Sequence, residues 1–275
     1  MRLTKHHALG NDFLVLLDLE QRLAVEGPMA RALCDRRRGV GADGLIQASA
    51  GTDGADVDMT LWNADGGAAE MSGNGIRCLG QAVARARRVD SVELDVGTAG
   101  GRRRVRVSPG SARGTAWVEV DMGPAGKGPK GAAPVSAPVL EAATVDMGNP
   151  HLVLLVDDPA TVDLAVLGPA CQGEFEAGIN VEVVAPRVGH ADTLDLRVWE
   201  RGAGVTEACG TGACAAAFVA HGWGLVGSRV RVCMPGGDLD VVLGDDTVSL
   251  AGPAVHVADV KVPVPPLGAG GAAWS

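Results

Sequence analysis

Two short segments of this chain combine a side chain capable of acid–base chemistry with a glycine-rich turn. Cys209 is followed by Gly210-Thr211-Gly212, and Ser72 is followed by Gly73-Asn74-Gly75. Both turns lead into a stretch typical of a helix, whose first N–H groups have no intrahelical acceptor and whose dipole adds partial positive charge. Such a start binds a carboxylate and stabilises a thiolate, so we expect a lowered pKa for the Cys209 thiol.

The other cysteines have no comparable setting. Without a glycine-rich turn beside it, a lone cysteine is usually a small buried hydrophobic residue. We interpret five cysteines in this way: Cys34, Cys78, Cys171, Cys214 and Cys233.

The stretches that follow the two turns differ in pattern. After Gly73, apolar residues recur every three or four positions, which predicts a helix with one buried stripe: Ile76, Leu79, Gly80, Val83 and Ala84. The stretch from Gly210 to Gly222 is small and apolar nearly all round, which indicates a central, tightly packed helix.

The two segments belong to an internal repeat. Gly10-Asn11-Asp12-Phe13 aligns with Gly148-Asn149-Pro150-His151, and Leu61-Trp62-Asn63 aligns with Val198-Trp199-Glu200. Each match, like that of the two glycine-rich turns, lies about 137 residues further along the chain, which indicates a tandem duplication.

The duplication and the short β-branched runs predict an α+β protein of two similar domains, residues 1–125 and 126–275, with the last strand able to pack back on the first domain. In each copy we expect a mixed sheet wrapped around one central helix. The Gly- and Pro-rich segment from Gly123 to Pro138 is expected to be a linker, and Pro28 to Arg38 a helix. Strands are expected at residues 2–6, 13–17, 57–62, 92–96, 105–107 and 117–120.

Composition excludes several classes. The net charge of −9 argues against a nucleic-acid or anionic-membrane partner, and no apolar run approaches the ~20 residues of a membrane span. The start of the chain lacks the pattern of a secretory signal, so a cytoplasmic protein is expected. The pair His6-His7 has no metal-like partner spacing, and no metal site is predicted.

Taken together, the motifs resemble the diaminopimelate epimerase family. The resemblance extends from residue 5 to about residue 260 and rests on Gly10-Asn11-Asp12-Phe13, Asn63-Ala64-Asp65-Gly66, Gly73-Asn74-Gly75-Ile76-Arg77-Cys78, Gly148-Asn149-Pro150-His151, Gly178-Ile179-Asn180, Glu200-Arg201-Gly202 and Ala208-Cys209-Gly210-Thr211-Gly212.

The resemblance implies two pseudo-symmetric α+β domains with the active site in the cleft between them. It implies interconversion of LL- and meso-diaminopimelate, a step of lysine biosynthesis and of the supply of a peptidoglycan precursor, without pyridoxal phosphate or another cofactor and without a metal. In the family, two cysteines on opposite faces of the substrate α-carbon remove and return the proton. The small-molecule substrate and a homodimeric assembly are the implied partners.

The resemblance also implies roles for single residues. The implied catalytic set is Cys209, Ser72, His151 and Glu200. The implied substrate-binding set is Asn11, Asn63, Gly73, Asn74, Asn149, Asn180, Arg201, Gly210 and Thr211, with Arg201 on the distal carboxylate.

One departure from the family pattern matters for the chemistry. Ser72 stands where the family has its first catalytic cysteine. A hydroxyl is a far weaker acid than a thiol, so it is a poor proton store and a poor base. Three readings stay open for Ser72: a slow or one-sided epimerase, a relative with different chemistry, or a Cys→Ser change made to hold substrate. Alternative functions are a one-base lyase acting on a related amino acid and a non-catalytic amino-acid-binding protein.

Overall fold

The structure is a computed structural model that describes residues 1–69, 71–131 and 139–263. The helices are α1 (Gly27–Cys34), α2 (Gly73–Arg87), α3 (Leu164–Gly173), α4 (Gly210–Gly222) and the short 3₁₀ helix η1 (Pro159–Thr161). The strands of the first half are β1 (Arg2–Ala8), β2 (Asn11–Leu17), β3 (Gly44–Ala50), β4 (Val57–Asn63), β5 (Ala68–Ala69), β6 (Val92–Thr98), β7 (Gly101–Pro109) and β8 (Thr115–Asp121). Those that follow are β9 (Gly126–Lys127), β10 (Glu141–Asp146), β11 (Pro150–Leu155), β12 (Asn180–Pro186), β13 (Thr193–Glu200), β14 (Gly204–Thr206), β15 (Arg229–Met234), β16 (Gly237–Leu243) and β17 (Val248–Lys261).

The chain divides into two compact units with the same succession of elements. Unit 1 comprises Met1–Val120 and the segment from Pro253, and unit 2 comprises Asp121–Gly252. In unit 1, β2 pairs with β3 and β4 pairs with β6 in parallel; in unit 2, the corresponding pairs β11–β12 and β13–β15 are also parallel. The neighbouring pairs β1–β2, β3–β4, β10–β11 and β12–β13 are antiparallel. The predicted duplication and the mixed sheets are therefore confirmed.

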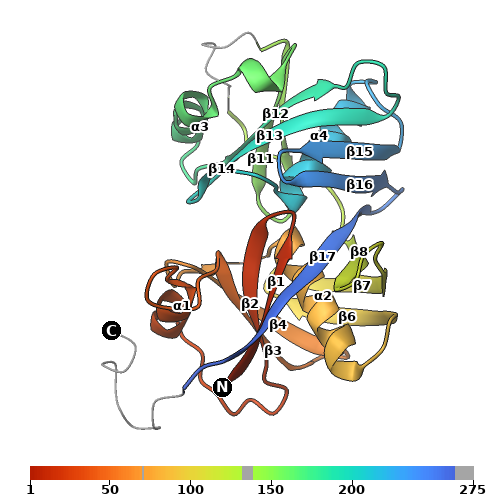
Figure 1. Cartoon of the computed structure of the whole chain (residues 1–275). Coiled ribbons are helices and arrows are strands. Elements are labelled where there is room, and N and C mark those ends of the chain that lie inside the picture. The colour runs from red at the N-terminus through yellow and green to blue at the C-terminus, as the bar shows by residue number, and fades with distance from the viewer. Residues whose placement is uncertain (70, 132–138, 264–275) are drawn as a thin grey trace. The chain divides into compact units, whose positions relative to one another are not determined.

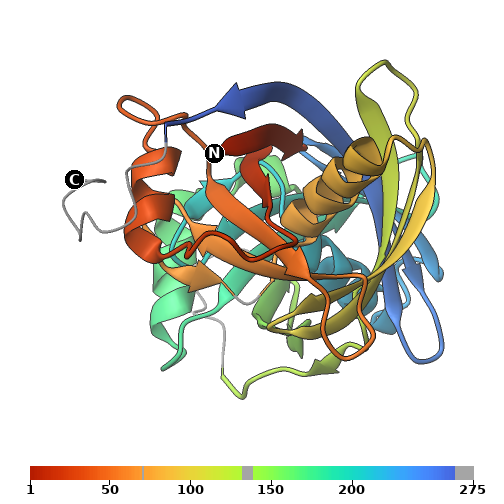
Figure 2. The ribbon, with the colours of Figure 1, turned by 90° about the horizontal axis from the view of Figure 1, so that it is seen from below.

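In unit 1 the sheet wraps around α2, as Figure 2 shows. The helix contacts β1, β2, β3 and β7, and its residues from Gly73 to Ala84 are buried. Gly80 allows the close approach, because a Cβ there would lie 2.9 Å from Val105 Cγ1. Helix α1 packs against β3 and β4, beside the sheet. The predicted central helix from Gly73 is confirmed.

In unit 2 the corresponding helix is α4, which contacts β10, β11, β12, β13, β15 and β16. Its alanines let the surrounding strands approach on all sides, and Ala213 to Ala217 are completely buried. Helix α3 packs on β12, β13 and β14 (Figure 1). The predicted helix from Gly210 to Gly222 is confirmed in its bounds, and it is buried from Gly210 to Ala217, whereas Phe218 is exposed.

Strand β17 contributes to both units. Its first residues pair with β16 in unit 2, with Asp240 opposite Ala251. Its last residues pair with β1 in unit 1, with Arg2 opposite Lys261. The boundary that we expected near residue 125 stays a prediction.

Two local expectations were wrong. Helix α1 ends at Cys34 and not at Arg38, because the Asp35 carboxylate accepts the N–H groups of Arg37 and Arg38, each at 2.7 Å, and these bonds turn the chain. The expected linker contains strand β9, whose Lys127 pairs with Val145 of β10, while residues 132–138 lie outside the described residues. Strand β3 was not predicted, since its sequence has no clear alternation.

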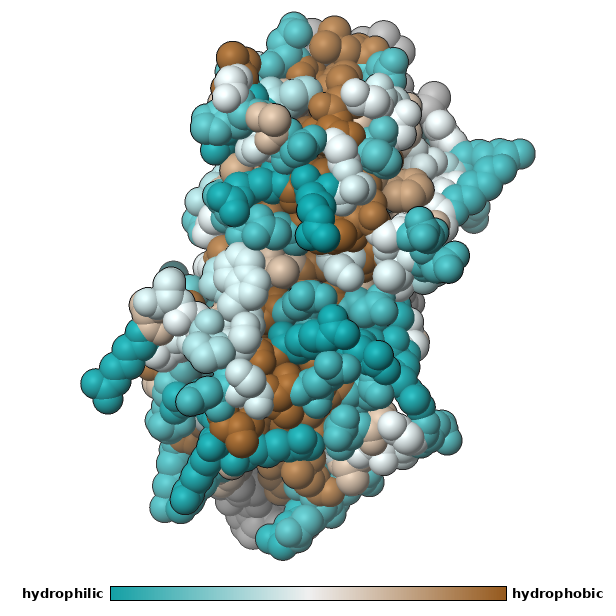
Figure 3. Space-filling view, turned by 90° about the vertical axis from the view of Figure 1, so that its right-hand side faces the viewer, coloured by the Kyte–Doolittle hydropathy of each residue, from teal (hydrophilic) through white to brown (hydrophobic). Residues whose placement is uncertain are grey.

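Within the described residues, every helix is too short or too polar to cross a membrane. On the face seen in Figure 3, hydrophilic side chains of both units lie beside apolar ones.

Candidate active site

The thiol of Cys209 lies at the start of α4. Cys209 is the residue before the helix, and its Sγ accepts the N–H of Gly212 at 3.4 Å and lies 3.4 Å from Thr211 Oγ1. Gly212 leaves room for this arrangement, because a Cβ there would lie 3.3 Å from Sγ and 2.7 Å from Glu182 Oε1. Cys209 is 4% exposed. The thiol is therefore held by the first turn of the helix in a largely dry setting.

The expected lowering of the pKa of Cys209 is wrong. Burial raises the pKa of the Cys209 thiol well above its usual range, and the nearby carboxyls of Glu200 and Glu182 raise it further. The hydrogen bonds from Thr211 and Gly212 act in the opposite direction and are outweighed. These surroundings therefore favour the protonated thiol.

The carboxyl of Glu200 lies near Cys209 and contributes to the raised pKa of the thiol. Glu200 is the last residue of β13, and its Oε1 accepts the hydroxyl of Thr206 at 2.5 Å. Burial raises the pKa of Glu200, while hydrogen bonds from Thr206 and Cys209 lower it. Because a thiolate and a carboxylate side by side repel each other, the two groups favour holding one proton between them.

His151 lies in a buried row of polar side chains in unit 2. Its Nδ1 is 2.7 Å from Glu182 Oε1, and its Nε2 is 2.9 Å from Asn149 Oδ1. His151 and Glu182 are both completely buried. Sequence reasoning missed Glu182; the available signal was an acidic residue inside the otherwise apolar strand β12.

Arg201 and Asn180 lie together at the end of β13. The backbone N–H of Arg201 donates to Asn180 Oδ1 at 2.8 Å, and its Nη1 donates to the Ala177 carbonyl at 2.7 Å. Gly178 leaves room for the arginine stem, since a Cβ there would lie 2.9 Å from Arg201 Cδ. The guanidinium is exposed and has no carboxylate partner in the described parts of the chain. It is therefore available to an external carboxylate.

In unit 1 the start of α2 is built in the same way. Ser72 is the residue before the helix, and its Oγ accepts the N–H of Gly75 at 3.0 Å. The side chain is half-buried. A Cβ on Gly75 would lie 3.2 Å from Ser72 Cβ, so the glycine again makes room for the capping residue. Ser72 thus takes the position in α2 that Cys209 takes in α4.

Asn74 and Asn11 are joined into one row beside Ser72. Arg77 Nη2 donates to Asn74 Oδ1 at 2.9 Å, and Asn74 Nδ2 donates to Asn11 Oδ1 at 3.2 Å. Asn11 Nδ2 in turn donates to Asp43 Oδ2 at 2.9 Å. Both amides therefore have a fixed orientation.

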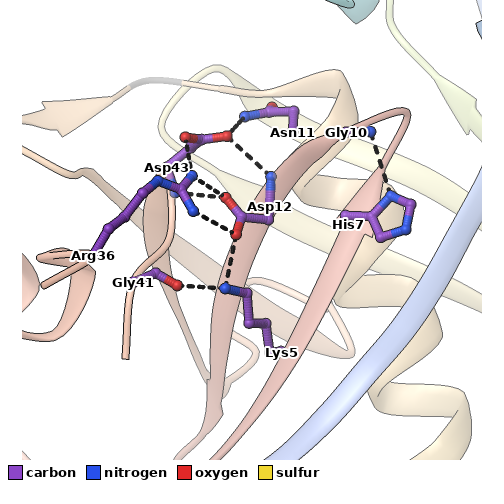
Figure 4. Close-up of polar contacts among 8 residues, drawn as sticks. All are labelled: Lys5, His7, Gly10, Asn11, Asp12, Arg36, Gly41 and Asp43. Atoms are coloured by element: carbon purple, nitrogen blue, oxygen red, sulfur yellow. Dashed lines mark hydrogen bonds and ion pairs between the residues drawn. The ribbon is translucent and has the colours of Figure 1, made fainter. Parts of the chain in front are cut away.

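A charged network supports Asp43 (Figure 4). Arg36 Nη2 donates to Asp43 Oδ1 at 2.7 Å and to Asp12 Oδ1 at 2.6 Å, and Lys5 forms an ion pair with Asp12 at 2.9 Å. Hydrogen bonds to Arg36 and Lys5 lower the pKa of Asp12 to about 2 against the opposing effect of its burial. This network of Lys5, Asp12, Arg36 and Asp43 was not predicted, because its members are spread over the first 43 residues.

Asn63 lies apart from the row of Asn74 and Asn11, with no side-chain hydrogen bond to either among the described residues. It lies exposed at the end of β4, where its N–H donates to the Gly67 carbonyl at 2.8 Å. Within unit 1 the structure thus brings together Ser72, Gly73, Asn74 and Asn11. Within unit 2 it brings together Cys209, Gly210, Thr211, Glu200, His151 and Asn149. Arg201 follows Glu200 directly, and Asn180, the first residue of β12, is bonded to the Arg201 N–H.

The described residues contain no group of three or more His, Cys, Asp or Glu side chains suited to hold a metal ion.

Solved structures with the same fold include two amino-acid racemases or epimerases. A probable proline racemase from Agrobacterium radiobacter K84 superposes with a TM-score of 0.75, covering 98% of this chain and 94% of its own at 15% identity. A hydroxyproline epimerase from Agrobacterium vitis gives 0.72 at 16% identity, with 94% and 91% covered. At this level of identity the likeness concerns the fold alone.

Sequence comparison is more specific. The diaminopimelate epimerase family model matches residues 3–127 and 143–257. The chain is 39% identical over 266 residues to the diaminopimelate epimerase of Corynebacterium glutamicum strain R, covering 92% of this chain and 95% of that protein. It is 38% identical over 283 residues to the enzyme of that name from Nostoc punctiforme, with 94% and 98% covered. The chain therefore belongs to the diaminopimelate epimerase family.

Proposed function

We propose that this chain converts LL-diaminopimelate into meso-diaminopimelate by removing the proton from one α-carbon and returning a proton to its opposite face, without pyridoxal phosphate or a metal. The observation that carries the proposal is the Cys209 thiol, which caps α4 and accepts the N–H of Gly212, in a chain aligned almost end to end with diaminopimelate epimerases. The proposal places the chain in lysine biosynthesis and in the supply of a peptidoglycan precursor.

Because the pKa of the Cys209 thiol is raised, the thiol must lose its proton before it can act as a base. The substrate brings an α-ammonium group, and a positive charge beside Sγ favours the thiolate. Glu200 then accepts the thiol proton, and the thiolate removes the α-proton. The electron pair of the broken C–H bond passes into the substrate carboxylate, where the N–H groups of Gly210 and Thr211 meet the growing negative charge. After this step the thiol proton is on Glu200, the α-proton is on Cys209 and the negative charge is on the substrate carboxylate.

The proposal assigns Ser72 to the opposite face of the same α-carbon, with the N–H groups of Gly73 and Asn74 bound to the carboxylate. Return of a proton from a hydroxyl is slow, because loss of effective general acid catalysis costs roughly 10²- to 10⁴-fold. We therefore expect exchange of the α-proton on the Cys209 face to outpace inversion.

The distal end of the substrate carries a second amino-acid group. We propose that Arg201 binds its carboxylate, since a guanidinium fork contacts both oxygens at once. Asn180 holds the backbone of Arg201 in place, and the amides of Asn63, Asn11 and Asn149 supply donors and acceptors for the remaining polar groups. His151 holds the side chain of Asn149 in place through the contact between its Nε2 and Asn149 Oδ1.

The test is proton exchange in D₂O with LL-diaminopimelate, for the protein as it stands, for Ser72→Cys and for Cys209→Ala. We expect deuterium incorporation in the parent, faster epimerisation by about 10²- to 10⁴-fold in Ser72→Cys, and no exchange on the Cys209 face in Cys209→Ala.

Other outcomes reject the proposal in distinct ways. Release of an unsaturated product would indicate a lyase, and tight binding without exchange in both the parent and Ser72→Cys would indicate a binding protein. Unchanged exchange in Cys209→Ala would remove Cys209 from the mechanism. Activity lost on dialysis against a chelator, and restored by a metal, would refute a metal-independent reaction.

We further propose that the protein is a cytoplasmic homodimer with a first domain ending near residue 125. Light scattering measures the mass in solution, and a monomer would contradict the assembly. Cell fractionation tests the location, and limited proteolysis tests the domain boundary.

A further inference from the structure

Glu182 is a buried acid that the proposed proton transfers do not use. It lies in the middle of β12, a strand with six of its seven residues buried, and it is itself completely buried. Its Oε1 is bonded to His151, while its Oε2 is buried without a hydrogen-bond partner among the described residues. Burying a carboxyl costs several kcal/mol unless it is paired, so its place in an apolar strand calls for a function.

The position of Glu182 follows from the strand register. In the parallel pair β11–β12, His151 lies opposite Asn180, and Glu182 is two residues further along the same face. The side chains of His151 and Glu182 therefore point into the same layer, between the sheet and the first turn of α4. The Glu182 carboxyl also fills the space that a side chain at Gly212 would need.

The two contacts of His151 together determine which of its nitrogens carries a proton. An amide oxygen can only accept, so the 2.9 Å contact between Nε2 and Asn149 Oδ1 requires a proton on Nε2. A protonated Glu182 then donates to Nδ1 across 2.7 Å, and burial favours this form because it raises the pKa of Glu182. The Asn149 amide is then fixed with its NH₂ group directed away from the ring.

The other copy of the repeat reaches the same result with different residues. Asn11 is the counterpart of Asn149, and its Oδ1 accepts a proton from Asn74 Nδ2 at 3.2 Å. In both units the asparagine oxygen therefore faces a donor of the protein, although in unit 1 an N–H of Asn11 is also bound, to Asp43 Oδ2 at 2.9 Å. This agreement is not imposed by the shared backbone, since Phe13 replaces His151 in unit 1.

We propose that Glu182 is a positioning residue for the reaction: it holds His151 so that Asn149 presents its N–H groups to the bound amino acid. This inference rests on the proposed function, because the substrate it names is the one proposed above. Glu182 contacts neither the substrate nor the reacting proton, and its positioning effect passes through His151 and Asn149.

The experiment is a double-mutant cycle read by α-proton exchange with LL-diaminopimelate in D₂O. Glu182→Leu leaves His151 free to turn and should lower kcat/KM about 10- to 100-fold, the range expected when a buried hydrogen-bonded group loses its partner. In an Asn149→Ala background the same change should cost less than about 3-fold, because the two residues act in one row. Equal losses in both backgrounds would overturn the proposal.

Glu182→Gln separates positioning from charge. A glutamine has nearly the same shape, and its NH₂ group can donate to Nδ1 while Nε2 keeps its proton, so activity should stay within about 5-fold of the parent. A loss as large as that of Glu182→Leu would assign the effect to the carboxylate charge and overturn the positioning role. Glu174→Leu and Glu174→Gln, at an exposed glutamate after α3, are the matched controls and should leave activity unchanged.

A readout independent of the reaction separates this inference from the proposed function. The ¹⁵N spectrum of labelled histidine in the ligand-free protein should show His151 with Nε2 protonated in the parent and in Glu182→Gln, and a mixture of tautomers in Glu182→Leu. If the parent fails to exchange diaminopimelate protons while these spectra are observed, the substrate is wrong and the positioning row stands. If His151 has the same tautomer in Glu182→Leu as in the parent, Glu182 does not position His151 and the proposal is refuted.

Discussion

Acid should destabilise unit 1 through His6, a buried residue that joins β1 to the central helix α2. His6 is completely buried; its Nδ1 is 2.8 Å from Gln81 Oε1, and its Nε2 is 2.9 Å from Thr4 Oγ1. Gln81 Nε2 donates to the Gly114 carbonyl at 2.9 Å, so Gln81 Oε1 must accept from His6. The ring is therefore neutral, with its proton on Nδ1.

The magnitude follows from the pKa of His6. Burial, the largest effect, lowers this pKa from 6.5 to about 4; the hydrogen bond that His6 donates to Gln81 opposes the change, and nearby His256 adds to it. Below pH 6.5 the unfolded chain binds a proton that the folded chain does not, so stability falls as the pH drops and the loss is complete below about pH 4. At ~1.36 kcal/mol per pKa unit, the loss is about 3 kcal/mol.

The assay is urea unfolding followed by tryptophan fluorescence, to which the buried Trp62 of unit 1 contributes, at pH 7 and at pH 4. His6→Gln should be less stable than the parent at pH 7, because it loses part of the packing, but its stability should fall by about 3 kcal/mol less between the two pH values. His190→Gln, at an exposed histidine of unit 2, is the control and should follow the parent. The same acid loss in His6→Gln as in the parent would refute the reasoning.

Three further outcomes are expected. Gly212→Ala should lower the free energy of unfolding by about 1–3 kcal/mol, because its Cβ would lie 2.7 Å from Glu182 Oε1; an unchanged urea midpoint would contradict the close packing at the start of α4. Arg201→Ala should raise the KM for diaminopimelate about 10- to 100-fold and change kcat less than about 3-fold, whereas an unchanged KM in steady-state assays would place the distal carboxylate elsewhere. Asp43→Asn removes the ion pair with Arg36 and weakens the hydrogen bond that holds Asn11. Steady-state kinetics should therefore show a KM raised by a few-fold, which corresponds to about 1 kcal/mol in binding. A larger effect on kcat than on KM would contradict a role in binding.

Local patterns were enough to predict the parts of this protein that depend on neighbouring residues. The apolar spacing after Gly73 and the alanine-rich stretch after Gly210 predicted the two central helices, because helix periodicity and burial repeat every three or four residues. The repeated motifs predicted the duplication, because both copies kept the glycines that the helix starts require. The family resemblance, confirmed by the comparisons, followed from these same motifs.

Only the tertiary structure decided what surrounds the proposed site residues. Glu182 lies beside His151 and Cys209 through the pairing of β11 with β12, a contact between strands that local spacing does not encode. The position of Cys209 at the start of a helix predicted a lowered pKa. The burial of the thiol and the contact with Glu182 raise it instead. The sign of such a shift depends on the balance between desolvation, neighbouring charges and helix donors. Of these, the sequence reveals only the donors, because the other two depend on which distant segments fold against the thiol.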